Sequence, residues 1–139
     1  MKNWDGTIHI SVSSIRIGFL WAQNLDPQTY PPNFEENLAV LLEKRKEPLS
    51  SEEEERRKKV RDMLRHGRYK PTGRGKPANE YLLREALKEN FPRINSFVDI
   101  NNFISLKYIL PISLWDLDKA GVREYEIRRG KKGESYIFN

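Results

Sequence analysis

Residues 91–108 read FPRINSFVDINNFISLKY, and this stretch decides the fold of the chain. Apolar residues surround most sides of a helix that we predict over residues 96–108, so we expect that helix to be buried. Polar side chains in a buried helix need hydrogen-bond partners, because each unsatisfied group costs about 1 to 3 kcal/mol. The polar residues concerned are Asp99, Asn101, Asn102 and Ser105. We interpret them as structural joints or as polar groups of a pocket.

Three further helices are predicted before this one. The first spans about residues 34–46 with Asn33 as its N-cap, the second begins at Ser50 or Ser51, and the third spans about residues 78–90. Apolar residues recur at helical spacing in the first and the third, which favours packing of both against a common core.

Alternation of apolar and polar residues predicts strands on both sides of the helices. Residues 7–23 alternate in two registers that change at Ser13-Ser14, where we expect a bulge or short turn. Residues 122–129 and 135–139 predict two more strands joined by a basic hairpin turn at residues 130–133. The order of strands, helices and strands favours an α+β domain, with helices packed on a mainly antiparallel sheet.

The length and composition favour a single domain over residues 1–139. Cysteine is absent, which fits a cytoplasmic protein without disulfides, and no apolar run is long enough to cross a membrane. His9 and His66 lack the spacing of a metal site, so we expect neither a metal nor a cofactor. Asp116 and Asp118 resemble an acid and base pair only superficially, since capping of a turn is the more common role of Asp.

Positive charge is concentrated in one part of the chain. The formal net charge is +5, yet residues 56–76 alone hold ten Lys or Arg against the single acid Asp62. Part of this charge pairs within the second helix, because each residue of the run 52–55 is a Glu that lies four residues before a base. The bases that remain without a predicted partner are Arg61, Arg65, Arg68, Lys70, Arg74 and Lys76.

Several of these bases lie in a loop rich in Gly and Pro, residues 66–77. A basic loop with one aromatic residue suits contact with phosphate, and it suits a solvated connector equally well. The order GxxxxGK[ST] of a nucleotide-binding loop is absent, which excludes a nucleotide hydrolase of that type.

Residues 70–133 carry a longer pattern. Residues 94–102 follow the order IN-x-x-VD-x-x-N, and residues 110–118 follow the order LP-x-x-x-x-D-x-D. In order and spacing this segment resembles the B3/B4 domain of bacterial-type phenylalanyl-tRNA synthetase β subunits, and the free-standing relatives of that domain more closely than the synthetases. Residues 1–69 then supply N-terminal strands and charged helices, and residues 70–139 carry the signature.

The resemblance implies an α+β domain of intertwined B3 and B4 halves, with a pocket that removes tyrosine wrongly attached to tRNA in the synthetases. It makes Asn95, Asn102, Ser113 and Asp116 candidates for a tRNA or ligand pocket. Candidates for phosphate binding are Arg68, Lys70, Arg74, Lys76 and Arg93.

Two departures from the family pattern bear on catalysis. The editing histidine of the synthetases falls on Ser113, and the sequence ends at Asn139, where we expect the B4 half to begin. We therefore expect a truncated domain, and the resemblance assigns no catalytic residue.

Three functions remain open from the sequence. The first is a module that binds tRNA or aminoacyl-tRNA through its basic loop. The second is a trans-editing aminoacyl-tRNA deacylase in which Ser113 or a water replaces the histidine. The third is a protein-interaction module without RNA, which forms a homo-oligomer through an open sheet edge after Tyr136, Ile137 and Phe138.

Overall fold

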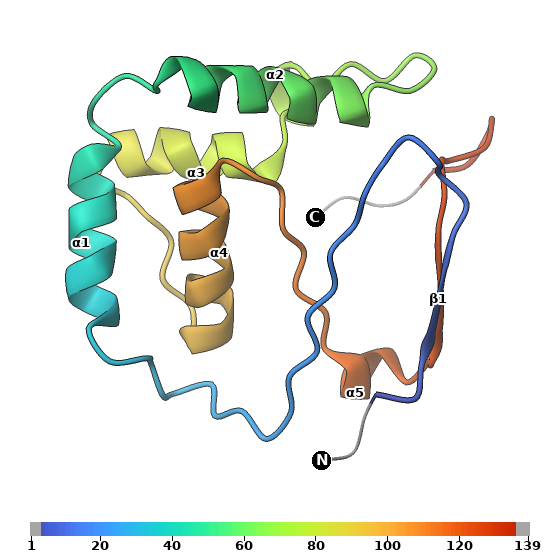
Figure 1. The fold of residues 1–139 in the computed structure, drawn as a ribbon, viewed down its shortest axis with the longest axis horizontal. Helices are drawn as coiled ribbons and strands as arrows, with labels where there is room; N and C mark the ends of the chain where they lie inside the picture. Colours follow the sequence, from blue (N-terminus) through green and yellow to red (C-terminus); the bar gives the residue numbers. More distant parts are fainter. Residues whose placement is uncertain (1–3, 136–139) are drawn as a thin grey trace. The chain divides into compact units, whose positions relative to one another are not determined.

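A computed structural model describes residues 4–135, with the exception of the side chain of Arg74 (Figure 1). The chain divides into two compact units. The helical unit is Gln23–Leu114, and the terminal unit combines Met1–Ala22 with Trp115–Asn139. The single domain expected over residues 1–139 stays a prediction beside this division.

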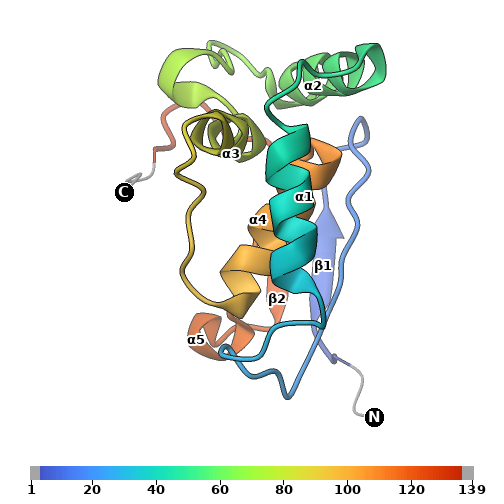
Figure 2. The same ribbon diagram turned by 90° about the vertical axis from the view of Figure 1, so that its left-hand side faces the viewer.

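All four predicted long helices are present in the helical unit. They are α1 (Phe34–Lys44), α2 (Ser51–Leu64), α3 (Ala78–Leu87) and α4 (Ser96–Tyr108), and the short 3-10 helix η1 (Gly73–Gly75) lies between α2 and α3. Within this unit α1 and α4 lie side by side (Figures 1 and 2). Helices α2 and α3 run across one end of that pair (Figures 1 and 2).

The core of the helical unit joins α1, α3 and α4. Leu106 on α4 is completely buried, and it packs with Leu41, Leu82 and Ala86. Phe103 of α4 also meets Phe34 of α1, with ring centroids 5.6 Å apart. The rest of α4 is less enclosed than the sequence predicts, because its other apolar side chains are half-buried or exposed.

The starts predicted for α1 and α2 have different outcomes. Ser50 caps α2 through a complete capping box, in which its side chain accepts from the Glu53 backbone and the Glu53 carboxylate accepts from the Ser50 backbone. Asn33 does not cap α1 with its side chain, so that prediction is wrong. Asn33 adopts a left-handed conformation with φ 61°, whereas a capping residue has an extended backbone that turns its side chain toward the helix end.

The predicted ion pairs along α2 form in part. Glu52 pairs with Arg56 and Glu55 pairs with Lys59, each four residues on. Glu54 instead pairs with a base three residues on, and Glu53 pairs with Arg45. The prediction missed Glu53 because its partner comes from outside the helix.

Arg45 is the most deeply buried basic side chain in the described part of the chain, with 2 % of its surface exposed. Its guanidinium donates to the Leu106 carbonyl from Nε and Nη2, and to the Lys107 carbonyl from Nη2. Nη1 donates to the Glu53 carboxylate at 2.7 Å. Burial acts to raise the pKa of Glu53, but bonds from Arg45 and the Ser50 backbone outweigh it and lower that pKa to about 2. One side chain therefore links the end of α1, the start of α2 and the end of α4.

The terminal unit contains a two-stranded sheet of β1 (Thr7–Ile10) and β2 (Glu124–Ile127), and the short helix α5 (Leu117–Ala120) precedes β2 in the sequence. The α+β class is confirmed. The two strands pair in parallel, with Thr7 beside Glu124, whereas we expected a mainly antiparallel sheet.

Residues 15–21 form no strand, although their alternation predicts one. Ser13-Ser14 do form the predicted turn. A strand needs a neighbour for its backbone groups, and residues 15–21 have none among residues 4–135. The strand predicted over residues 135–139 lies, apart from Ser135, outside the described residues. None of the described helices is long and apolar enough to span a membrane.

Replacing Arg45 by Met should lower the free energy of unfolding by about 3 kcal/mol, because the change leaves the largely buried Glu53 carboxylate and two carbonyls without their donor. Urea denaturation monitored by circular dichroism measures the loss. The matched control is Lys44→Met, since Lys44 is exposed and contacts the same carboxylate at 3.6 Å. Equal effects of the two substitutions would contradict the role given to Arg45.

Candidate nucleic-acid interface

The basic loop, residues 66–77, connects α2 to α3 and has a defined backbone. The Tyr69 hydroxyl donates to the Gly75 carbonyl at 2.6 Å, which ties one end of the loop to the other. Backbone bonds from Thr72 to Lys70 and from Gly75 to Thr72 tighten the segment between them. A Cβ at Gly75 would lie 3.1 Å from the Lys70 carbonyl oxygen and 3.3 Å from the Tyr69 ring, so this close approach favours glycine. The loop therefore holds its bases on a folded backbone.

Three bases of this loop carry uncompensated charge. Arg68, Lys70 and Lys76 are exposed, and none of them forms an ion pair or a side-chain hydrogen bond with another described residue. Arg74 belongs to η1, and its predicted role falls on a side chain outside the described atoms. Tyr69 adds an aromatic residue that is 48 % exposed.

Two bases that we expected to be uncompensated have acidic partners. Arg61 forms a bidentate pair with Glu80 on α3, with both distances 2.5 Å, and Arg65 pairs with Asp62 at 3.0 Å. The first pair joins residues that are 19 positions apart, so sequence spacing along one helix did not reveal it. Arg61 and Arg65 therefore add less uncompensated charge beside the loop than the composition suggests.

The start of α4 is organised by Asp99, which is completely buried. Its carboxylate accepts from the Arg93 Nε, the Ile94 backbone and the Tyr30 hydroxyl at 2.7 to 2.8 Å. Burial acts to raise the pKa of Asp99, but these three donors together lower it. Of the two interpretations left open for Asp99, the contacts fit a structural joint.

Arg93 differs from the other phosphate-binding candidates because acids already surround it. Besides Asp99, it makes a bidentate pair with Glu35 at 2.5 and 2.8 Å. Its guanidinium also lies 5.4 Å from the Tyr30 ring centroid. Bonds from Glu35 and Asp99 raise the pKa of Arg93. Its predicted contact with phosphate stays a prediction, and the observed contacts hold the start of α4.

The pocket candidates are not gathered into one observed site. Asn95 is the N-cap of α4, and its side chain accepts from the Val98 backbone at 3.1 Å. Asn102 is half-buried on α4 and Ser113 is exposed, and neither side chain has a hydrogen-bond partner within residues 4–135. Asp116 belongs to the terminal unit and caps α5, as the capping interpretation of this residue predicts.

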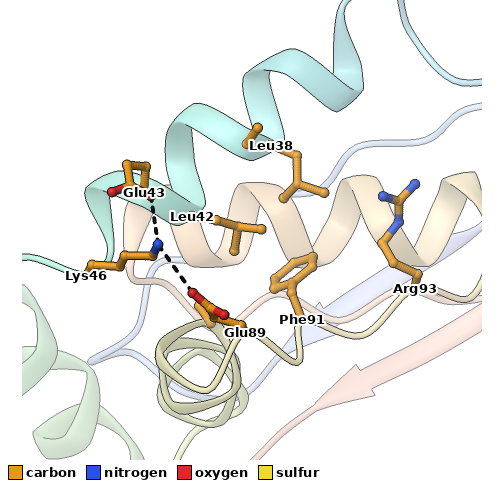
Figure 3. A pocket seen from close by; sticks show the side chains of 9 residues that line it. Leu38, Leu42, Glu43, Lys46, Glu89, Phe91 and Arg93 are labelled. Atoms are coloured by element: carbon orange, nitrogen blue, oxygen red, sulfur yellow. Dashed lines mark ion pairs between the residues drawn. The ribbon is translucent and has the colours of Figure 1, made fainter.

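A pocket of about 320 Å³ does lie in the helical unit, but its lining includes none of these four residues. Leu38 and Leu42 of α1 face Phe91, and Lys46 bridges Glu43 and Glu89 at its rim (Figure 3). No group of three or more potential metal-ligating side chains occurs in the described part of the chain.

Sequence reasoning missed two further features near the basic loop. Arg84 lies 5.0 Å from the ring centroid of Tyr81, and both are exposed on α3. Residues three apart on a helix are neighbours on its surface, so the spacing of Tyr81 and Arg84 could have indicated this contact. Asn79 is completely buried, and its amide has no hydrogen-bond partner among the described residues. Nothing in the sequence indicates that Asn79 is buried.

Comparison with known proteins relates about half of the sequence to a known family. The family model described as the B3/4 domain matches residues 70–138, a segment that begins inside the basic loop. Residues 70–138 therefore belong to the B3/4 domain family, which confirms the resemblance noted in the sequence.

The similar proteins are beta subunits of phenylalanine–tRNA ligase. The subunit of Staphylococcus saprophyticus subsp. saprophyticus is 31 % identical over 58 residues, which cover 42 % of this chain and 7 % of that protein. The subunit of Geobacillus kaustophilus is 44 % identical over 43 residues, which cover 31 % of this chain and 5 % of that protein. The chain thus matches less than a tenth of the length of either relative. No solved structure matches it significantly.

Replacing Asp99 by Asn should lower the free energy of unfolding by about 2 kcal/mol at pH 7, because bonds to a charged acceptor become bonds to a neutral amide. The folded-state pKa of Asp99 lies below its ordinary value, so this contribution is complete above about pH 4. It is lost as the pH falls through the folded-state pKa. Urea titrations from pH 7 down to pH 2 should show the two proteins converging, and a difference independent of pH would refute the assignment.

Proposed function

We propose that the chain is a module that binds tRNA or aminoacyl-tRNA through the basic loop. The observation that carries the proposal is the set of three exposed bases, Arg68, Lys70 and Lys76, which have no acidic partner in the described part of the chain. Exposed bases without acidic neighbours lose no ion pair when they meet phosphate, so each adds to binding. The family relationship favours tRNA over other anions, since the relatives are beta subunits of phenylalanine–tRNA ligase.

The form of the loop also suits an RNA ligand. The hydroxyl of Tyr69 is bound to Gly75, which fixes the ring while 48 % of the residue stays exposed. An immobilised aromatic ring beside bases is a platform on which an unstacked nucleobase can lie. The loop thus combines charge for the backbone with a ring for a base.

Replacing Arg68, Lys70 and Lys76 together by Gln should weaken tRNA binding at least tenfold. The slope of the logarithm of the binding constant against the logarithm of salt concentration should fall in magnitude by about 2 to 3, since each lost phosphate contact removes about 0.7 to 0.9. Fluorescence anisotropy with labelled tRNA at several salt concentrations measures both quantities.

The control for this experiment removes the same charge elsewhere. Lys46, Lys59 and Lys119 each pair with an acidic side chain, and replacing them by Gln also lowers the net charge by three. This control should keep most of the affinity. Equal losses in both triple variants would mean that net charge and not the loop governs binding. Absence of tRNA binding by the unaltered chain at low salt would refute the proposal itself.

A deacylase is the second hypothesis carried from the sequence, and the geometry favours it less. A hydroxyl nucleophile needs a base within hydrogen-bond reach, but the Ser113 hydroxyl has no partner among residues 4–135. We therefore expect this chain to release tyrosine from Tyr-tRNA no faster than a control without protein. Release of labelled tyrosine over time tests this, and a faster rate that is lost in Ser113→Ala would restore the deacylase.

Two other expectations stay predictions. Oligomerisation through Tyr136, Ile137 and Phe138 concerns residues outside the described part of the chain. The cytoplasmic location predicted from the composition also awaits a direct measurement.

A further inference from the structure

Residues 15–21, with the sequence IRIGFLW, have the pattern of a strand but no strand partner. Their backbone groups form no hydrogen bond with any other residue in the range 4–135. The segment follows the turn at Ser13-Ser14 and belongs to the terminal unit. Unpaired backbone groups in an extended apolar segment are a template for another strand.

The side chains of this segment are too exposed for an apolar sequence. Phe19, Leu20 and Trp21 are 53 %, 96 % and 37 % exposed, and Ile15 and Ile17 are only half-buried. Covering such side chains contributes about 25 cal/mol for each Å² removed from water. An interaction that covers the segment is therefore favourable.

The described residues of the terminal unit do not form a buried apolar cluster of their own. The buried cluster of Leu41, Leu82, Ala86 and Leu106 lies wholly in the helical unit. Among the described residues of the terminal unit, Val12 is the one buried apolar side chain. A two-stranded sheet is marginal in water, and parallel sheets normally have both faces covered. Further strands would complete the unit.

We propose that two copies of the chain pair through residues 15–21 as antiparallel strands, related by a two-fold axis at Gly18. In this register Ile17 of one copy faces Phe19 of the other, and Ile15 faces Trp21. The two-fold axis repeats both pairs, which gives four cross-strand pairs. Each joins a β-branched residue to an aromatic one on the same face of the sheet, a favourable combination. The surface is self-complementary, as an isologous dimer requires.

Charge and backbone also suit a second copy as the partner. Arg16 is the one charged residue of the segment and faces Leu20 of the other copy, so the two Arg16 side chains start about 14 Å apart along the strands. Gly18 faces Gly18, and open space surrounds it in the single chain. Glycine within a strand often marks close approach of another backbone.

Neighbouring residues give a matched test, because residues 19 and 20 point to opposite faces of a strand. Sedimentation velocity of the full chain over a range of concentrations should show a dimer. Phe19→Lys should weaken dimerisation at least tenfold by placing a charge against Ile17. Leu20→Glu should preserve or strengthen the dimer, because the new carboxylate faces Arg16 of the other copy.

Cysteine cross-linking tests the register without relying on the stability of a charged variant. The chain has no cysteine, so each link must use the introduced thiol. Paired residues have Cα atoms about 4.5 to 5.5 Å apart, which is within the disulfide range, so Gly18→Cys should form a covalent dimer under mild oxidation. Arg16→Cys should not form a covalent dimer, because residue 16 lies on the same face as Gly18 but about 14 Å along the strands from residue 16 of the other copy.

Three results would overturn this proposal. The first is an unaltered chain that is monomeric at all concentrations, and the second is equal cross-linking by the two cysteine variants. The third is a dimer that survives Phe19→Lys and does not cross-link through Gly18→Cys, since that dimer uses another surface. Binding of tRNA tests the basic loop separately, so either proposal can fail while the other stands.

Discussion

The buried guanidinium of Arg45 is the interaction on which the helical unit depends. Four helices need to be held at defined angles, but the apolar cluster joins only α1, α3 and α4. Arg45 supplies the missing connection, because it binds the carbonyls at the end of α4 and the carboxylate at the start of α2. The carbonyls at the end of a helix have no partner within it, and a cation is the group that satisfies them best. The position of α2 therefore follows from electrostatics more than from burial.

The position of the basic loop depends on the ion pairs that hold α2 and α3. Helix α2 has a single buried residue, Val60, and is held at its start by Arg45 and near its end by the pair of Arg61 with Glu80. That second pair also fixes the start of α3, to which the loop leads. Two ion pairs thus align both helices that flank the loop, while its own bases stay unpaired. Charges that hold the helices are thus compensated inside the protein, whereas the bases of the loop are left uncompensated, as the proposed binding of phosphate requires.

Local features of the fold were predictable from the sequence and long-range ones were not. Helix α4 was located correctly from the apolar residues that surround most of its sides, and the cap of α2 is Ser50, one of the two starts that the sequence offered. The partners of Arg45 and Asp99 lie as many as 62 and 69 residues away, and no spacing rule reaches that far. The same limit explains residues 15–21, where alternation reports which faces a strand would bury but not whether a neighbour exists. For the candidate site, the exposed bases of the loop were foreseen, whereas the loss of Arg61 and Arg65 to acidic partners was not.

The family signature and the candidate site rest on different residues. Asn95 caps α4, Asp99 fastens the segment before it, and Asp116 caps α5, so these three residues of the signature have structural roles. A pattern built from such residues identifies a fold, because the same joints are needed wherever the fold occurs, whatever the chemistry. The bases and the aromatic ring lie instead in a loop, where side chains are free of the demands of packing. Similarity over residues 70–138 therefore concerns the architecture of that segment, while the proposed recognition of a ligand depends on charges that the described structure leaves uncompensated.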